Sequence, residues 1–106
     1  MGISTHVLDA TTGRPAAGLA LALSRRAGDA WQDLGQRATD ADGRVSDLAG
    51  KVEAGVYRIV FQTGAYLGGD AFYPEVVVVF RITDPDAHHH VPLLLSPFAY
   101  STYRGS

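Results

Sequence analysis

The sequence of 106 residues lacks cysteine and carries little net charge. Without cysteine, the chain has no disulfide, no thiolate ligand for zinc and no cysteine nucleophile. Its formal charge is −2 with histidine neutral, and charged residues make up 19% of the chain. Nucleic acid or an anionic membrane surface would require a basic face on its partner, so neither is expected to bind.

Long apolar runs are also missing. Runs such as Val76 to Phe80 are far too short to span a bilayer. The segment from Met1 to His6 has no basic stretch followed by an apolar one, so a signal peptide is not expected. We therefore expect a soluble protein of the cytoplasm, or of the periplasm if a leader has been removed.

The chain shows no amphipathic helix of ten or more residues and no internal repeat of 20 to 50 residues. Hydrophobic residues make up 46% of it, which is typical of a globular chain. A domain of this size buries roughly two-thirds of its unfolded surface, which is enough for one core. A single domain spanning residues 1–106, without a linker, is the expectation.

Short apolar segments separated by Gly, Pro and Asp turns predict strands. The expected strands are residues 3–8, 19–25, 30–39, 45–48, 55–61, 72–82, 88–95 and 100–103, and the expected turns are residues 11–15, 40–43 and 84–86. Residues 63–69 are expected to be a short helix or a turn. The four valines from Val76 to Val79 indicate a strand buried on both faces. Seven or eight short strands predict an antiparallel β-sandwich, with a partly closed barrel as the alternative.

The four histidines are the first candidates for chemistry. His88 and His90 lie on one face of their strand and His89 lies on the other. Three interpretations stay open: zinc ligands, proton-transfer groups with a pKa near 6.5, or solvated residues beside the turn at 84–86. A metal site would need a third ligand, and only His6 could be another histidine ligand.

Three further polar residues have both an ordinary and a functional interpretation. His6, in the middle of a strand, could be a structural or surface residue. Arg44 directly follows Gly43 at a turn, where a solvated cation is common, although its guanidinium fork could also hold a planar, carbonyl-rich ligand. Ser106 could be a frayed terminal residue. No serine lies in a Gly-x-Ser-x-Gly turn and no P-loop is present, so the residues alone predict a β-sandwich with a histidine site.

Three segments, in order along the chain, carry a family resemblance. The first is residues 5–9 (THVLD) with 13–16 (GRPA), the second is residues 39–44 (TDADGR), and the third is residues 88–98 (HHHVPLLLSPF) with 100–106 (YSTYRGS). Together they resemble the 5-hydroxyisourate hydrolases, the transthyretin-related enzymes of urate breakdown, over essentially the whole chain. Each segment is short, and the specificity comes from finding all three in the right order.

The main alternative within this resemblance is transthyretin, a carrier on the same fold. The carrier shares the Leu-Ser-Pro and Tyr-Ser-Thr parts of the last segment but lacks the Tyr-Arg-Gly-Ser ending and the histidine and arginine set. Residues 103–106 have that ending, so the resemblance favours the enzyme. His89 departs from the family, which often has tyrosine there. Because residue 89 points away from the face of residues 88 and 90, we expect the change to be tolerated.

The resemblance implies a fold and an assembly. The fold is an all-β, transthyretin-like (prealbumin-like) antiparallel sandwich of two four-stranded sheets with one short helix, placed at residues 63–69. The assembly is a homotetramer, a dimer of dimers, with active sites in a channel between dimers. A symmetric interface would supply the concavity that a small sandwich lacks. It would also order the tail at residues 103–106.

The resemblance further implies hydrolysis of 5-hydroxyisourate to 2-oxo-4-hydroxy-4-carboxy-5-ureidoimidazoline, with no metal and no cofactor. The implied catalytic residues are His6, Arg44, His90 and Ser106, and the implied substrate-binding residues are His6, Arg44, Tyr103 and Arg104. Two alternatives of a different class remain. One is a transthyretin-like binding protein without turnover, and the other is a zinc hydrolase built on the three histidines at positions 6, 88 and 90.

Each implied residue has a part in this reaction. His6 and His90 would position and deprotonate the attacking water, and the resemblance does not say which of them is the base. Arg44 would bind the substrate and offset the negative charge of the tetrahedral intermediate. Tyr103 would contact the ring, and residues 104 and 106 would complete the wall of the site.

Overall fold

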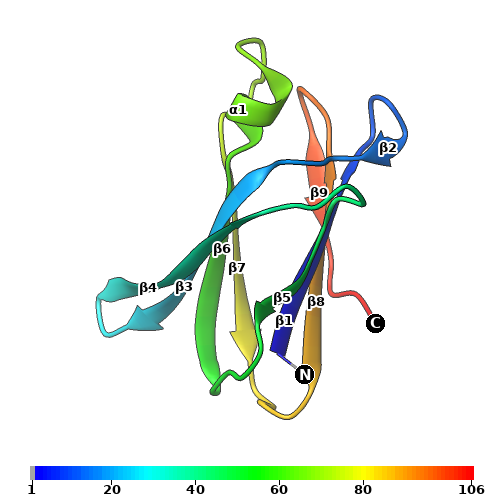
Figure 1. The fold of residues 1–106 in the computed structure, drawn as a ribbon. Coiled ribbons are helices and arrows are strands. Elements are labelled where there is room, and N and C mark those ends of the chain that lie inside the picture. Colours follow the sequence, from blue (N-terminus) through cyan, green and yellow to red (C-terminus); the bar gives the residue numbers. More distant parts are fainter. Residues whose placement is uncertain (1) are drawn as a thin grey trace.

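The computed structural model describes residues 2–106, which form nine strands and one short helix. The elements in chain order are β1 (Gly2–Asp9), β2 (Arg14–Pro15), β3 (Ala20–Ala27), β4 (Ala30–Ala38), β5 (Arg44–Ala49), β6 (Gly55–Phe61), α1 (Thr63–Leu67), β7 (Val76–Ile82), β8 (His88–Leu95) and β9 (Tyr100–Thr102). Figure 1 shows two twisted sheets facing each other, with α1 at one end and the C-terminal tail beside β8. The helix is not long and apolar enough to cross a membrane, and the described residues hold no other.

The first sheet has the order β2-β1-β8-β9, with β5 also paired to β1, and the second has the order β4-β3-β6-β7. Within residues 2–106 no strand pairing joins the two sheets, so the predicted sandwich is confirmed over the barrel. One pair is not antiparallel, because β1 and β8 run parallel along their whole length. Parallel neighbours need a long connection, and here the chain builds the entire second sheet between them.

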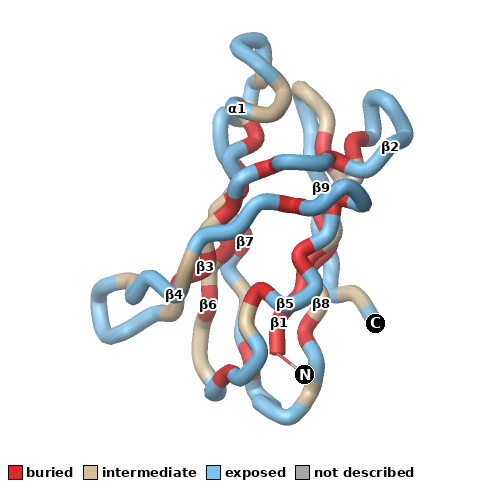
Figure 2. The backbone as a smooth tube through the Cα atoms, in the orientation of Figure 1, coloured by how far each residue is buried: buried red, intermediate tan, exposed pale blue. Residues whose placement is uncertain are grey.

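The core lies between the inner faces of the two sheets. Figure 2 shows buried segments concentrated where the sheets face each other. The inward residues of β1 and β6 are Ile3, Thr5, Val7, Tyr57, Ile59 and Phe61, all 1% exposed or less. Because successive residues of a strand point to opposite faces, the alternate residues of β1, Ser4 and His6, are presented on the outer face of the first sheet.

The prediction that the valines of β7 are buried on both faces is wrong. Val76 and Val78 are buried, whereas Val77 is 41% and Val79 is 50% exposed. The strand is the edge of the second sheet, and only its inward side chains reach the core. It also begins at Val76, because residues 72–75 form an irregular segment instead of the first part of the strand.

The remaining local predictions fit with small changes. The helix expected within residues 63–69 is α1, and it ends at Gly68, whose positive φ of 96° suits a residue without a side chain. The turn expected at residues 11–15 includes the short strand β2, which pairs with the end of β1. The last strand ends at Thr102, one residue before the predicted end.

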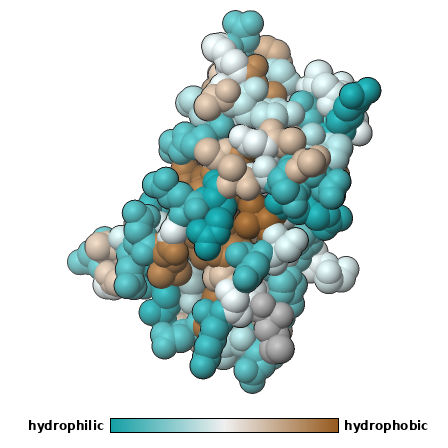
Figure 3. Space-filling model, in the orientation of Figure 1, coloured by the Kyte–Doolittle hydropathy of each residue, from teal (hydrophilic) through white to brown (hydrophobic). Residues whose placement is uncertain are grey.

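The strand β4 extends beyond the sheet opposite it, and none of its nine residues is buried. A cleft of about 520 Å³ opens beside it between the sheets, with the core residues Leu48, Val52 and Tyr57 as its floor. Apolar side chains are visible among polar ones in the middle of this face in Figure 3. The predicted site residues lie elsewhere, on the first sheet.

Candidate functional site

The predicted histidines and arginine converge on the outer face of the first sheet. Ser4 of β1 pairs directly with His90 of β8, and His6 of β1 pairs directly with Arg44 of β5. Directly paired residues of neighbouring strands point to the same face. His88, two residues before His90, joins them because it has the same parity on β8. Three segments far apart in the sequence thus present their polar side chains on one surface.

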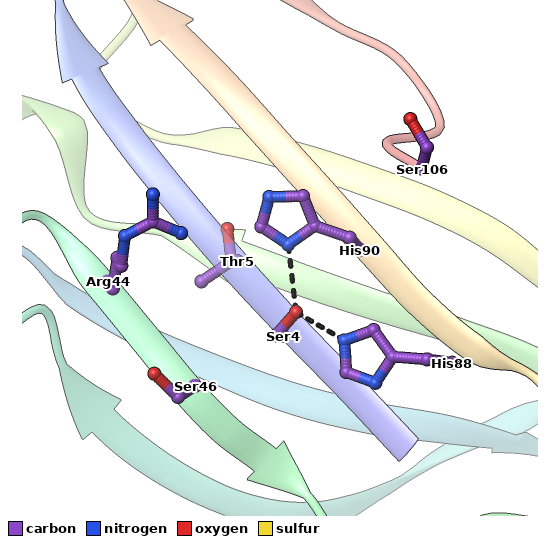
Figure 4. A pocket seen from close by; sticks show the side chains of 7 residues that line it. All are labelled: Ser4, Thr5, Arg44, Ser46, His88, His90 and Ser106. Carbon is purple, nitrogen blue, oxygen red and sulfur yellow. Dashed lines mark hydrogen bonds between the residues drawn. The ribbon is translucent and has the colours of Figure 1, made fainter. Parts of the chain in front are cut away.

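A polar cleft of about 320 Å³ lies over this surface (Figure 4). The residues lining it are Ser4, Thr5, Arg44, Ser46, His88, His90 and Ser106. His6 lies on the same face but does not line this cleft, and its Nε2 is 3.0 Å from the carbonyl oxygen of Asp42. The structure therefore brings His90, Arg44 and Ser106 together and leaves His6 at the margin.

The turn before β5 positions Arg44. The carboxylate of Asp40 accepts hydrogen bonds from the backbone N–H groups of Asp42 and Arg44, each at 2.9 Å. Gly43 has a positive φ of 74°, and a Cβ there would collide with the carbonyl oxygen of Val7. The Asp and Gly residues that predicted this turn therefore have a structural role, since they hold the turn against β1 and place Arg44 at the start of β5.

Two imidazoles share one hydroxyl in this cleft. The Oγ of Ser4 lies 2.7 Å from Nε2 of His88 and 2.8 Å from Nδ1 of His90. Figure 4 shows the other ring nitrogen of His90 on the side toward Arg44. His90 thus has one nitrogen held by the protein and the other directed into the cleft.

The surroundings of His90 lower its pKa below the usual 6.5. Burial is the largest cause, followed by the nearby charges of Arg44, His6 and His88, while a hydrogen bond with the backbone of Ser4 opposes the shift. Burial and the neighbouring positive charges each disfavour the imidazolium form of His90. His90 is therefore neutral at pH 7, which is the form that can accept a proton.

The tail reaches this site, as expected. The backbone N–H of Gly105 donates a 2.9 Å hydrogen bond to the carbonyl oxygen of His90, and the two residues form an isolated antiparallel bridge. A Cβ on Gly105 would lie 2.5 Å from Cδ2 of His90, closer than carbon atoms approach without a bond. A side chain at residue 105 would therefore force the imidazole or the tail to shift, and the next residue, Ser106, lines the cleft.

Tyr103 and Arg104 lie in a neighbouring cavity. This second cavity has a volume of about 140 Å³, is largely apolar, and lies between the tail, β7 and β8. His90 borders both cavities. In this chain the side chain of Tyr103 is 59% exposed and does not line the first cleft, so the parts predicted for residues 103 and 104 stay predictions.

His89 points into the molecule, as alternation predicts, and is only 6% exposed. Its Nδ1 is buried without a hydrogen-bond partner among the described residues. The side chain borders the second cavity from the inside, opposite to the face of His88 and His90. The departure from the family's usual tyrosine therefore does not enter the polar cleft.

Within residues 2–106, no group of three or more His, Cys, Asp or Glu side chains is arranged to hold a metal ion. The three histidines at positions 6, 88 and 90 share a face without forming such a group. Sequence reasoning missed Ser4, Thr5 and Ser46 as residues of the cleft. A signal was present for Ser4 and Ser46, because each lies two residues from a predicted site residue, His6 or Arg44, on the same strand face.

Comparison with known proteins identifies the family. The model of the HIUase/transthyretin family matches residues 3–105. The chain belongs to the HIUase/transthyretin family. Within that family, the 5-hydroxyisourate hydrolase of Salmonella dublin is 44% identical over 109 residues, which cover 98% of this chain and 80% of the relative.

The solved structures similar to this chain include a 5-hydroxyisourate hydrolase and a transthyretin. The 5-hydroxyisourate hydrolase of Klebsiella pneumoniae superposes with a TM-score of 0.87 at 35% identity, covering 98% of this chain and 97% of its own. Sea bream transthyretin in complex with thyroxine superposes with a TM-score of 0.90 at 36% identity, covering 97% and 93%. A named hydrolase and a thyroxine-bound transthyretin thus match the fold almost equally, so the fold alone does not indicate an activity.

Proposed function

We propose that this chain is a 5-hydroxyisourate hydrolase that opens the ring by adding water to the ring carbonyl and breaking the carbon–nitrogen bond. The observation that carries the proposal is the meeting of His90, Arg44 and the tail in one polar cleft. Curated relatives from bacteria and mouse, at 44% and 45% identity, are named 5-hydroxyisourate hydrolases.

The cleft contains the two kinds of group that this chemistry needs. His90 is a base, because its lowered pKa keeps it neutral and one ring nitrogen faces the cleft. Arg44 is a cation that can offset charge developing on the carbonyl oxygen. General base catalysis contributes roughly 10²–10⁴-fold and one oxyanion donor about 10²–10³-fold, which together give a large acceleration.

His6 acts with these two from the margin of the cleft. It pairs with Arg44 across β1 and β5, and its charge contributes to the lowered pKa of His90. In the proposed reaction it orients the attacking water or the substrate. Tyr103 contacts the ring of the substrate, and Arg104 with Ser106 completes the wall of the site.

The proposed active form is a homotetramer, a dimer of dimers. Two features support it. The cleft of one chain is open and polar, and at about 320 Å³ it is at the small end of the range of roughly 300–1,000 Å³ for ligand sites. Large hydrophobic residues, including Phe72, Phe98 and Tyr103, are 59% to 72% exposed. Chain association would enclose the substrate and cover such side chains.

The test is a decay assay. Urate oxidase generates 5-hydroxyisourate from urate, and its ultraviolet absorbance is followed with and without this protein, each time with a strong chelator present. We expect the protein to accelerate the decay and the chelator to leave the acceleration unchanged. No acceleration would favour a transthyretin-like binding protein, and an acceleration abolished by the chelator would favour a zinc hydrolase.

A further inference from the structure

The Ser4 hydroxyl bridges two histidines, a contact that the proposed function does not by itself require. Its hydroxyl has one proton and lies within hydrogen-bond distance of two imidazole nitrogens, on His88 and His90. It can donate to only one of them, so the other imidazole must donate to Ser4. The protonation of the two histidines is therefore linked through one rotatable O–H group.

We propose that Ser4 and His88 form a proton relay behind His90, which lets His90 accept the proton of the attacking water while the resulting positive charge moves to His88. This inference rests on the proposed function and names Ser4 and His88 as positioning residues for the base.

The relay is balanced in protons. At the start, Nδ1–H of His90 donates to Ser4, and the hydroxyl of Ser4 donates to the bare Nε2 of His88. When Nε2 of His90 takes a proton from water, the Nδ1 proton passes to Ser4 and the hydroxyl proton passes to His88. His90 ends neutral with its proton on Nε2, Ser4 ends as a neutral hydroxyl, and His88 ends as the imidazolium.

The reverse shift completes the reaction. As water adds, its oxygen bonds to the carbonyl carbon, and the bond from that carbon to the ring nitrogen then breaks. The leaving nitrogen takes the proton from Nε2 of His90. His88 returns its proton to Ser4, and Ser4 returns one to Nδ1 of His90, so that the starting state is restored without a co-reactant.

The charges around the two histidines favour this direction. Arg44 on β5 and His6 on β1 both face His90, and Arg104 borders the second cavity that His90 also lines. His90 is half-buried, so an imidazolium there would be poorly solvated and beside another cation. His88 also lines the cleft but is exposed, so water can solvate its charge.

The experiment compares four variants of the full chain. Ser4→Ala removes the connecting hydroxyl, and Ser4→Thr restores one. His88→Gln keeps hydrogen-bonding groups but cannot take up a proton. Ser24→Ala is the matched control, because Ser24 is a similarly buried serine on the other sheet, 3% exposed against 8% for Ser4. The readouts are kcat, KM, and the dependence of kcat on the deuterium fraction of the solvent.

We expect Ser4→Ala and His88→Gln to lower kcat by roughly 10- to 100-fold with little change in KM. This loss of kcat is smaller than the full contribution of a general base, about 10²–10⁴-fold, because His90 itself remains. Ser4→Thr and Ser24→Ala should behave like the wild type. The deuterium dependence should be curved in the wild type, because several protons move, and linear in Ser4→Ala. A wild-type kcat in either Ser4→Ala or His88→Gln, or no rescue by Ser4→Thr, would overturn the relay.

A measurement without substrate separates this inference from the proposed function. In protein labelled with ¹⁵N histidine, protonation of His88 should change which ring nitrogen of His90 carries its proton, and Ser4→Ala should abolish that coupling. If the ring nitrogens of His90 do not respond to His88 in the wild type, the relay is wrong even for an active hydrolase. If the coupling is present and the wild type does not accelerate substrate decay, the hydrolase assignment fails instead.

Discussion

Gly105→Ala should reduce activity through one added methyl group. The new Cβ would lie 2.5 Å from Cδ2, 3.2 Å from Cγ and 3.3 Å from Cβ of His90. Carbon atoms in contact prefer separations of about 3.5–4.0 Å, so the shortest distance must grow by roughly 1 Å. Either the imidazole turns away, or the tail moves outward.

Each adjustment disturbs the site. Turning the ring strains its 2.8 Å contact with Ser4, and moving the tail breaks the 2.9 Å hydrogen bond from Gly105 to the carbonyl of His90. An off-rotamer side chain and a lost hydrogen bond each cost about 0.5–1.5 kcal/mol. At about 1.36 kcal/mol per tenfold change in rate, either adjustment alone should lower kcat/KM by about 2- to 13-fold, and both together by roughly 160-fold at most.

The assay is the ultraviolet decay of 5-hydroxyisourate, with thermal unfolding measured in parallel. Gly69→Ala is the matched control, because a Cβ there would meet nothing within 4 Å and Gly69 has no positive φ. The control should keep wild-type kinetics and the wild-type midpoint of unfolding, whereas the midpoint of Gly105→Ala should fall by roughly 4–8 °C for each kcal/mol lost. Wild-type kcat and KM in Gly105→Ala would refute the argument that the tail and His90 are in close contact.

Three other predictions concern the site and the core. His6→Ala, which removes a group that orients the attacking water or the substrate, should lower activity by about 10²-fold. Arg44→Ala, which removes the cation beside the carbonyl oxygen, should lower it by about 10²–10³-fold. Sedimentation should show the same assembly as the wild type for both variants, and wild-type rates in either would contradict the assignment. Because the cation of Arg44 lowers the pKa of His90, Arg44→Gln should raise that pKa toward 6.5 in an NMR titration of the ring, and an unchanged or lower pKa would show that the two side chains do not interact. Thr39→Val should destabilise the fold by about 1–3 kcal/mol in urea unfolding, because the buried Thr39 hydroxyl accepts a hydrogen bond from the backbone N–H of Leu19 at 2.9 Å. Thr83→Val, at an exposed position, is the control and should change the free energy of unfolding by less than about 0.5 kcal/mol.

Local patterns predicted most strands but not their surroundings. The first strand was predicted at residues 3–8, and the period of two along β1 accounts for the inward Ile3, Thr5 and Val7 and the outward Ser4 and His6. The same logic failed at β7, because a run of valines does not show whether its strand is central or at an edge. That depends on which strands pair, and the pairing is set by contacts between segments far apart in the chain.

The parallel pairing of β1 and β8 was also beyond local reasoning, and it matters most for the site. This pairing places Ser4 beside His90, residues 86 positions apart. Periodicity put His88 and His90 on one face, but it could not show which residue of another strand would meet them. The shared hydroxyl of Ser4 is a product of register, which no single segment contains.

The C-terminal tail shows which features of this protein follow from the sequence and which follow only from the tertiary structure. The order of side chains in the chain determined the fold class and the family resemblance, including the Tyr-Arg-Gly-Ser ending at residues 103–106. Turn residues, alternation and the order of motifs can all be read along the sequence without knowing which segments meet in space. Only the tertiary structure decided that Gly105 touches the ring of His90, that Ser106 enters the polar cleft, and that Tyr103 and Arg104 border a second cavity. The physical reason is that these contacts depend on where β8 and the tail meet in space, and that meeting is decided by sheet pairing and core packing across the whole chain.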